Sequence, residues 1–177
     1  MIYLWTIPRW PGGFLFRSFF SIKFSKQGSA LATIEAKPID ILLVEDSDAD
    51  AHLTERALLK GKIDNKLHRA TDGVEAMAFL RGEAPFADAP RPDLILLDLN
   101  MPRMDGKAVL REIGADPSLR LIPVVVLTTS NHDNDILETY GLNSNAYIVK
   151  PVDVSQFFEV IQKTHDFWLR VVKLPPA

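Results

Sequence analysis

The sequence predicts an α/β protein built on a doubly wound, five-stranded parallel sheet with helices on both faces. Two observations support this fold class. From residue 38 to residue 172, five short apolar runs alternate with five helical patterns, which is typical of parallel strands joined by right-handed helical crossovers. The interior runs are also continuously apolar, as strands covered on both faces require. The length of 177 residues fits one domain with a sizeable core.

The five apolar runs are predicted as strands because each is short and is bounded by turn or polar residues. They cover residues 39–44, 66–70, 94–97, 123–127 and 145–149. The second run is more polar than the others, which favours a position at the edge of the sheet. The third run ends abruptly at Asp98, and Pro102 rules out a strand or helix that continues.

The helical patterns follow these strands and cover residues 48–60, 73–81, 106–113, 133–140 and 154–172. Ser47 or Asp48 can cap the first helix, and Gly61 can end it. Gly141 can end the fourth helix, and the last helix stops before Pro175. Residues 82–92 form a proline-rich loop before the third strand.

Residues 1–36 differ from the rest of the chain, so we expect a boundary between them and a domain over residues 37–177. The segment is rich in aromatic residues and carries four basic residues against Glu35 alone, a net charge of +3. Its longest apolar stretch, residues 13–22, is interrupted by Arg17 and is too short to span a bilayer. No membrane span is therefore expected. A leader outside the fold and an arm packed on the domain or a neighbour both stay open.

Charge and composition exclude several classes of function. The chain carries a net charge of −3, so the residues after position 36 carry −6, which disfavours nonspecific nucleic-acid binding. The chain has no cysteine, which excludes disulfides, thiolate catalysis and metal sites with Cys ligands. Histidines at positions 52, 68, 132 and 165 show no metal-ligand spacing, and we expect ordinary surface or edge residues there.

Polar or charged residues follow four of the five predicted strands. They are Glu45 and Asp46 after the first strand, Asp98 after the third, Thr128 after the fourth and Lys150 after the fifth. In open α/β sheets, ligands bind outside the carboxyl ends of the strands. We therefore expect these side chains to form one site at that edge.

The residue types in this set favour phosphoryl chemistry. Three neighbouring carboxylates repel one another, and a divalent cation relieves that repulsion. An all-oxygen ligand set without Cys or His fits Mg²⁺, which typically binds one or two carboxylates together with a phosphate. Lys150 and Thr128 can then bind phosphoryl oxygens. Asp98 becomes a candidate nucleophile that forms an acyl phosphate.

Four stretches of the sequence carry a resemblance to a known family. They are Ile41-Leu-Leu-Val-Glu-Asp46, Leu94-Ile-Leu-Leu-Asp-Leu-Asn-Met-Pro-Arg-Met-Asp-Gly106, Val124-Val-Val-Leu-Thr-Thr129 and Ala146-Tyr-Ile-Val-Lys-Pro151. In order and spacing they resemble the receiver domain of two-component response regulators, over residues 38–173. The resemblance implies a flavodoxin-like strand order of 2-1-3-4-5.

The resemblance also implies roles for individual residues. Asp98 matches the phosphoacceptor. Glu45 and Asp46 match the acidic pair that holds Mg²⁺, with Asp98 and the backbone carbonyl of Asn100 as further ligands.

Three more matches concern residues expected to respond to phosphorylation. Thr128 matches the switch hydroxyl, Tyr147 the aromatic switch position and Lys150 the family's lysine. The bond between Lys150 and Pro151 is expected to be cis. Phosphorylation is expected to shift the face formed by the last strand and its two flanking helices toward an active form.

These matches predict a stand-alone cytoplasmic response regulator that accepts a phosphoryl group from a histidine kinase. The 26 residues after Pro151 leave room for one helix but not for an output domain. The protein is expected to be a signalling phosphoprotein that takes part in its own phosphorylation and dephosphorylation, rather than an enzyme with another substrate.

The last helix and the proline-rich loop are similar to those of small receivers paired with bacterial phytochrome kinases. Phe157, Ile161, Trp168 and Val171 share one face of that helix at helical spacing. The helix carries more apolar residues than one buried stripe needs, so we expect a homodimer in which it takes part.

Three other functions are alternatives to a phosphorylated receiver. A phosphatase of the haloacid-dehalogenase type needs a second Asp two residues after its nucleophile, where Asn100 stands, and places that nucleophile on the first strand. A flavodoxin-like FMN binder needs a phosphate loop after the first strand, where residues 45–50 are acidic. A receiver-like scaffold or dimerisation module that is not phosphorylated stays open as the alternative.

Overall fold

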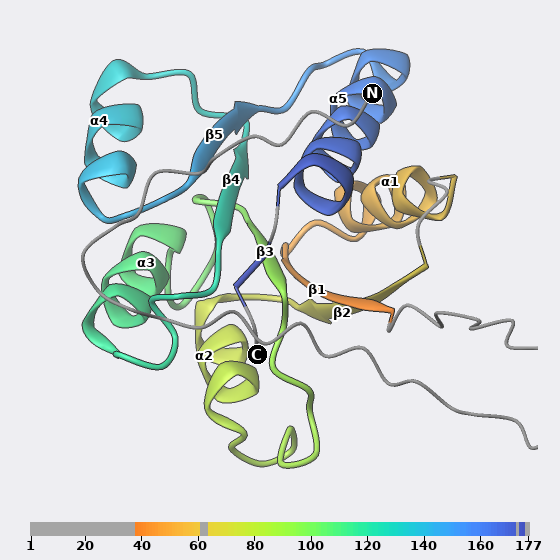
Figure 1. The fold of residues 1–177 in the computed structure, drawn as a ribbon. Helices are drawn as coiled ribbons and strands as arrows, with labels where there is room; N and C mark the ends of the chain where they lie inside the picture. The colour runs from red at the N-terminus through yellow and green to blue at the C-terminus, as the bar shows by residue number, and fades with distance from the viewer. Residues whose placement is uncertain (1–37, 61–63, 173, 176–177) are drawn as a thin grey trace, which may run out of the picture. The chain divides into compact units, whose positions relative to one another are not determined.

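The computed structural model describes residues 38–60, 64–172 and 174–175, and these contain the predicted five-stranded sheet (Figure 1). Its strands are β1 (Ile39–Val44), β2 (Asn65–Ala70), β3 (Leu94–Leu97), β4 (Val124–Thr128) and β5 (Ala146–Val149). All four neighbouring pairs are parallel, and the order is β2-β1-β3-β4-β5. The predicted order 2-1-3-4-5 is confirmed, as is the edge position of β2.

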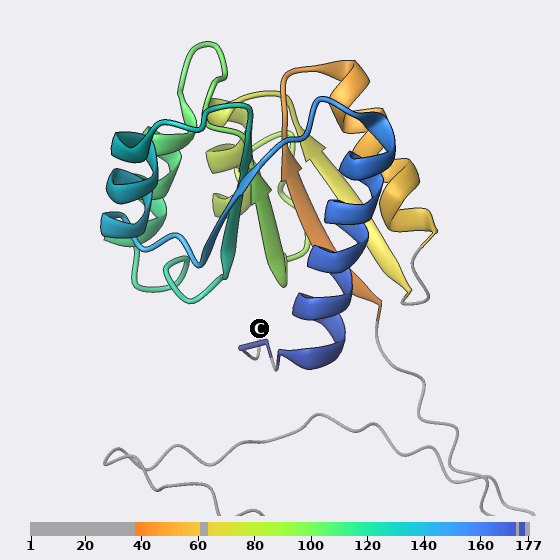
Figure 2. The same cartoon turned by 90° about the horizontal axis from the view of Figure 1, so that it is seen from above.

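Helices cover both faces of the sheet, as predicted (Figures 1 and 2). They are α1 (Asp48–Leu59), α2 (Gly73–Arg81), α3 (Gly106–Ala115), α4 (Asp133–Gly141) and α5 (Val154–Asp166). α1 and α5 lie on one side of the sheet, whereas α2, α3 and α4 lie on the other. The right-handed crossover rule produces this division because the chain winds outward in both directions from β1.

Two apolar layers hold the helices against the sheet. Successive residues of a strand point to opposite faces, so Leu42 and Val44 of β1 pack toward α2 and α3, while Ile41 and Leu43 pack toward α1 and α5. All four are buried. This double burial explains why β1 reads as a continuous apolar run, and it fixes the carboxyl ends of the central strands at one edge.

Side-chain caps set the starts of the helices that follow the site-forming strands. Ser47 caps α1 and accepts a hydrogen bond from the backbone N–H of Asp50 at 3.3 Å. Asp105 caps α3 in the same way through Ala108. α2 is capped by the buried Asp72, which accepts hydrogen bonds from two backbone N–H groups. The first turns of α1 and α3 are therefore fixed close to the ends of β1 and β3.

The end of the last helix differs from the prediction. α5 stops at Asp166, and the chain continues as a π-helix from Phe167 to Val171. A π-helical turn holds more residues than an α-helical turn, so it shifts the phase of the apolar stripe. Phe157 and Ile161 are buried as expected, but Val171 leaves the buried face and is 74% exposed.

One further expectation, the isomer of the Lys150–Pro151 bond, is wrong. The structure places a cis peptide at Ala84–Pro85, whereas the Lys150–Pro151 bond, predicted to be cis, is trans. The two isomers of an X-Pro bond differ by only about 0.5–1 kcal/mol, so the local sequence does not decide between them. The expectations for residues 1–36 and for Gly61 as a helix stop lie outside the described residues. Within the described part of the chain, no helix is both long and apolar enough to cross a membrane.

Candidate functional site

The carboxyl edge of the sheet brings together residues that lie far apart in the sequence. Glu45 and Asp46 follow β1, Asp98 follows β3, Thr128 ends β4 and Lys150 follows β5. These four strands are consecutive neighbours in the sheet, so their ends meet at one place (Figure 1). The predicted convergence at this edge is therefore observed.

Three carboxylates form the acidic side of the site. One oxygen each from Glu45, Asp46 and Asp98 lies within 4.8 Å of the others. Oxygens bound to one Mg²⁺ are at most roughly 4.2 Å apart, twice the usual bond length, so a small inward movement suffices for shared binding. Glu45 and Asp98 are 1% and 6% exposed, whereas Asp46 faces solvent. The group thus fits a divalent cation that enters from the solvent side and keeps some of its water.

Burial makes the acidic group costly without a positive partner. It raises the pKa of the Glu45 carboxyl above its ordinary value, and the charge of Asp98 adds to this. The hydrogen bond and the charge of Lys150 act in the opposite direction but do not cancel the effect of burial. The site therefore favours any cation that can approach Glu45 and Asp98.

Lys150 supplies that positive charge in the structure. Its Nζ atom donates hydrogen bonds to Glu45 Oε2 at 2.5 Å, Asp98 Oδ2 at 2.7 Å and Asp50 Oδ2 at 2.9 Å. Burial by itself lowers the pKa of the ammonium, but the bonds to Asp98 and Glu45 outweigh burial and hold the pKa above its usual value. All three donors of the ammonium are engaged by carboxylates.

Thr128 and Asn100 form the other side of the site. The Thr128 hydroxyl is buried and lies 3.4 Å from both the side-chain amide of Asn100 and the backbone N–H of Ser130. The backbone N–H of Asn100 donates to Asp98 Oδ1 at 3.1 Å. Asn100 therefore contacts both the predicted phosphoacceptor and the predicted switch hydroxyl, which places its backbone beside the carboxylates.

Tyr147 contacts the same segment from the neighbouring strand. Its hydroxyl donates to the Ser130 carbonyl at 2.9 Å, and partial burial raises its pKa. The Ser130 hydroxyl is 2.5 Å from Asp135 Oδ2 at the start of α4, and Lys107 of α3 also binds Asp135. The segment after β4 therefore connects Thr128, Tyr147 and the start of α4.

Gly106 allows the loop after β3 to close tightly. A Cβ atom on Gly106 would lie 2.2 Å from the carbonyl oxygen of Asp98, far closer than van der Waals contact. The Gly106 N–H also donates to the Leu99 carbonyl at 3.0 Å. The absent side chain thus lets the start of α3 pack directly on the backbone of Asp98.

Comparison with known proteins decides the family. A model of the response regulator receiver domain matches residues 41–162 of this chain. The chain belongs to this family. Members are signalling proteins that bind a divalent metal and accept a phosphoryl group in two-component systems.

Relatives similar to this receiver include phytochrome response regulators, as the sequence resemblance predicted. The chain is 46% identical to response regulator Rcp1 from Synechocystis sp. (strain PCC 6803) over 140 residues, which cover 79% of this chain and 95% of Rcp1. The structure of the phosphorylated cyanobacterial phytochrome response regulator RcpA matches with a TM-score of 0.77 and 46% identity, covering 79% of this chain and all of that one. The Mn²⁺-bound form of Rcp1 matches with a TM-score of 0.76 and 46% identity over 78% of this chain and all of that one.

The structure also shows contacts that were not predicted. Asp50, in the first turn of α1, holds Lys150, and Arg69 of β2 contacts the loop after β1. His165, expected at the surface, is only 2% exposed. It lies four residues after the buried Ile161, so the helical period that marked the apolar stripe could have indicated its burial.

His68 lies on the edge strand β2, as expected. Its Nε2 atom is 2.9 Å from Asp40 Oδ1, within hydrogen-bond distance.

Proposed function

We propose that this receiver takes a phosphoryl group on Asp98 from the phosphohistidine of a histidine kinase, with Mg²⁺ bound by Glu45, Asp46, Asp98 and the backbone carbonyl of Asn100. One observation carries the proposal. Carboxylate oxygens from the ends of β1 and β3 lie within 4.8 Å of one another, and the ammonium of Lys150 lies within hydrogen-bond distance of Glu45 and Asp98. This arrangement provides a nucleophile, a cation site and a fixed positive charge in one place.

The reaction needs a carboxylate nucleophile and charge compensation. An oxygen of Asp98 forms a bond to phosphorus while the phosphorus–nitrogen bond of phosphohistidine breaks, and the electron pair of that bond returns to the imidazole. Mg²⁺ neutralises negative charge on the phosphoryl oxygens when it is bound. Lys150, already in contact with Asp98, needs only a small movement to pair with a phosphoryl oxygen. The same groups let the receiver take part in the gain and loss of its own phosphate.

The contacts around Thr128 suggest how the modification becomes a signal. The Thr128 hydroxyl holds its present position through weak contacts of 3.4 Å, so a phosphoryl oxygen on Asp98 competes for it readily. Movement of Thr128 pulls on Ser130, to which both Tyr147 and the start of α4 are attached. We propose that this shifts the surface formed by α4, β5 and α5 between two populations.

We further propose that the kinase is a bacteriophytochrome. The support is the similarity to the cyanobacterial phytochrome response regulator RcpA. Histidine kinases draw their phosphate from ATP, so the transfer is expected in the cytoplasm. A homodimer that involves the end of the last helix completes the proposal, because Phe167 and Val171 are 52% and 74% exposed there.

Incubation with acetyl phosphate and Mg²⁺, followed by intact mass measurement, tests the phosphoacceptor. We expect a labile adduct with the mass of one phosphoryl group, and we expect Asp98→Asn to lack it while it remains folded. Asp88→Asn, in the exposed loop before β3, is the matched control and should be labelled like the wild type. An unlabelled wild type would instead favour the scaffold without phosphorylation, and a labelled Asp98→Asn would show that Asp98 is not the acceptor.

A further inference from the structure

Arg69 makes an unusual set of contacts with the loop that carries the acidic pair. Arg69 lies in β2, beside β1, and its guanidinium reaches over the end of β1. Nε and Nη2 donate to the carbonyl of Glu45 at 3.2 and 3.1 Å, and Nη2 also lies 3.3 Å from the carbonyl of Asp46. Nη1 donates to Asp48 Oδ1 at 2.7 Å. One side chain thus contacts two residues of the β1–α1 loop and the first residue of α1.

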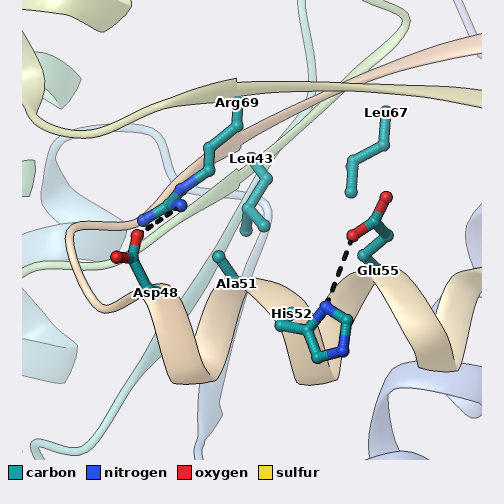
Figure 3. A pocket seen from close by; sticks show the side chains of 7 residues that line it. All are labelled: Leu43, Asp48, Ala51, His52, Glu55, Leu67 and Arg69. Atoms are coloured by element: carbon teal, nitrogen blue, oxygen red, sulfur yellow. Dashed lines mark hydrogen bonds and ion pairs between the residues drawn. The ribbon is translucent and has the colours of Figure 1, made fainter.

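We propose that Arg69 is a positioning residue that fixes the β1–α1 loop so that Glu45 and Asp46 present their carboxylates to a divalent cation. The inference rests on the proposed cation site. Figure 3 shows the guanidinium extended toward the first turn of α1, where it pairs with Asp48. Arg69 touches no carboxylate of the proposed cation site, so it would act through the backbone of the ligands.

The β1–α1 loop is held by Lys150 on one side and by Arg69 on the other. Lys150 binds a side chain of the loop, whereas Arg69 binds its backbone. On the inner side, Lys150 binds the side chain of Glu45, so its grip competes with a cation for that carboxylate. On the outer side, Arg69 binds the backbone carbonyls of Glu45 and Asp46 and does not engage their carboxylates. When a cation displaces Lys150 from Glu45, the inner contact is lost and the Arg69 contacts remain. The loop then keeps its shape in the loaded site.

The geometry requires an arginine in particular. A guanidinium presents several N–H groups in a planar fork, so it can bond two carbonyls and a carboxylate together. A lysine has the same charge but places it at one point on a flexible stem. If Arg69 formed only a surface ion pair with Asp48, whose side chain is 93% exposed, the contribution would be small. The additional hydrogen bonds to the Glu45 and Asp46 carbonyls are what would let Arg69 fix the position of the loop.

The test compares the Mn²⁺ affinity of the full chain with those of Arg69→Lys and Arg69→Met, measured by electron paramagnetic resonance of the free ion. Mn²⁺ shares the preference of Mg²⁺ for oxygen ligands. Residues that support metal ligands typically contribute 10–100-fold to affinity, and we expect about tenfold weaker binding for Arg69→Lys. Arg81→Lys is the matched control: Arg81, at the end of α2, pairs with Glu112 of α3 and forms no hydrogen bond or ion pair with the described site residues, so its substitution should leave affinity unchanged.

The two variants separate positioning from charge. Arg69 is a cation near a cation site, so loss of its charge alone would tighten Mn²⁺ binding. Weaker binding by both variants, with thermal unfolding that shows each is folded at the assay temperature, supports the positioning role. Unchanged affinity in Arg69→Lys, or tighter binding in Arg69→Met, overturns it. If the wild type itself binds no Mn²⁺, the proposed cation site is wrong, and this outcome is distinct from a failure of the Arg69 proposal alone.

Discussion

Replacement of Lys150 by methionine perturbs the site at its most connected residue. The substitution keeps most of the side-chain volume but removes an ammonium that bonds Glu45, Asp98 and Asp50. The Lys150, Glu45 and Asp98 side chains are 4%, 1% and 7% exposed, so the variant leaves buried carboxylates without a partner. We therefore expect Lys150→Met to destabilise the metal-free protein strongly.

The size of the expected loss in unfolding free energy follows from the carboxylates that remain buried after the substitution. Removal of one partner of a buried ion pair costs about 3–5 kcal/mol, because the other charge loses its compensation. Asp50 is one-third exposed and can be solvated, so we expect the low end, about 3 kcal/mol at about pH 8. A domain with a free energy of unfolding of about 5–15 kcal/mol survives this loss. Mg²⁺ at about 100 times its dissociation constant would restore about 2.7 kcal/mol.

The loss of stability in Lys150→Met should depend on pH, and the raised pKa of Glu45 sets its direction. Burial already raises the pKa of Glu45, and removal of Lys150 removes the main influence that lowers it. A carboxyl whose pKa is raised by folding favours the native state at pH values below its unfolded pKa, and this contribution is lost as pH rises through the native pKa. The destabilisation of Lys150→Met relative to wild type should therefore be smaller at about pH 5 than at about pH 8.

Urea unfolding with a chelator and then with Mg²⁺, at both pH values, measures these quantities. Lys163→Met is the control, because the pair of Lys163 with Glu159 is exposed and should contribute little to stability. The reasoning is refuted if metal-free Lys150→Met is as stable as wild type at the higher pH, or if its deficit grows as pH falls.

Three other substitutions and one solution measurement address the remaining features. Gly106→Ala should lose about 1–3 kcal/mol and accept phosphate more slowly, because its Cβ would collide with the Asp98 backbone. Gly114→Ala, within α3 and with no neighbour closer than 3.9 Å to its Cβ, should instead be neutral or slightly stabilising, and equal effects in the two variants would contradict this. Sedimentation should show a dimer that Val171→Asp weakens; a monomer at high micromolar concentration, phosphorylated or not, would exclude the proposed dimer.

The sequence was sufficient for the elements that depend on local patterns. Continuous apolar runs located β1, β3 and β4, and each polar residue that follows such a run lies at the carboxyl edge because parallel strands all end there. Asp98 and Thr128 could therefore be assigned to one site from the sequence. The cap residues Ser47 and Asp105 also stand where helix-start rules place them.

Contacts that depend on three-dimensional placement could not be predicted in this way. Asp50 looked like one more acid in the first turn of a helix, and its bond to Lys150 exists because α1 begins beside the end of β5. Arg69 looked like an ordinary charge on an edge strand, and its partners become visible only through the register of β2 with β1. The exposure of Val171 depends on the π-helical turn, for which the sequence carries no comparable signal.

The position of a bound cation would decide whether the acidic residues form one metal site. A crystal grown with Mn²⁺ and measured at its absorption edge would locate the ion through anomalous scattering. We expect one strong peak roughly 2 Å from oxygens of Asp46 and Asp98, with Lys150 displaced from at least one of its carboxylates. A peak elsewhere, with Lys150 still bonded to both Glu45 and Asp98, would contradict the proposed site.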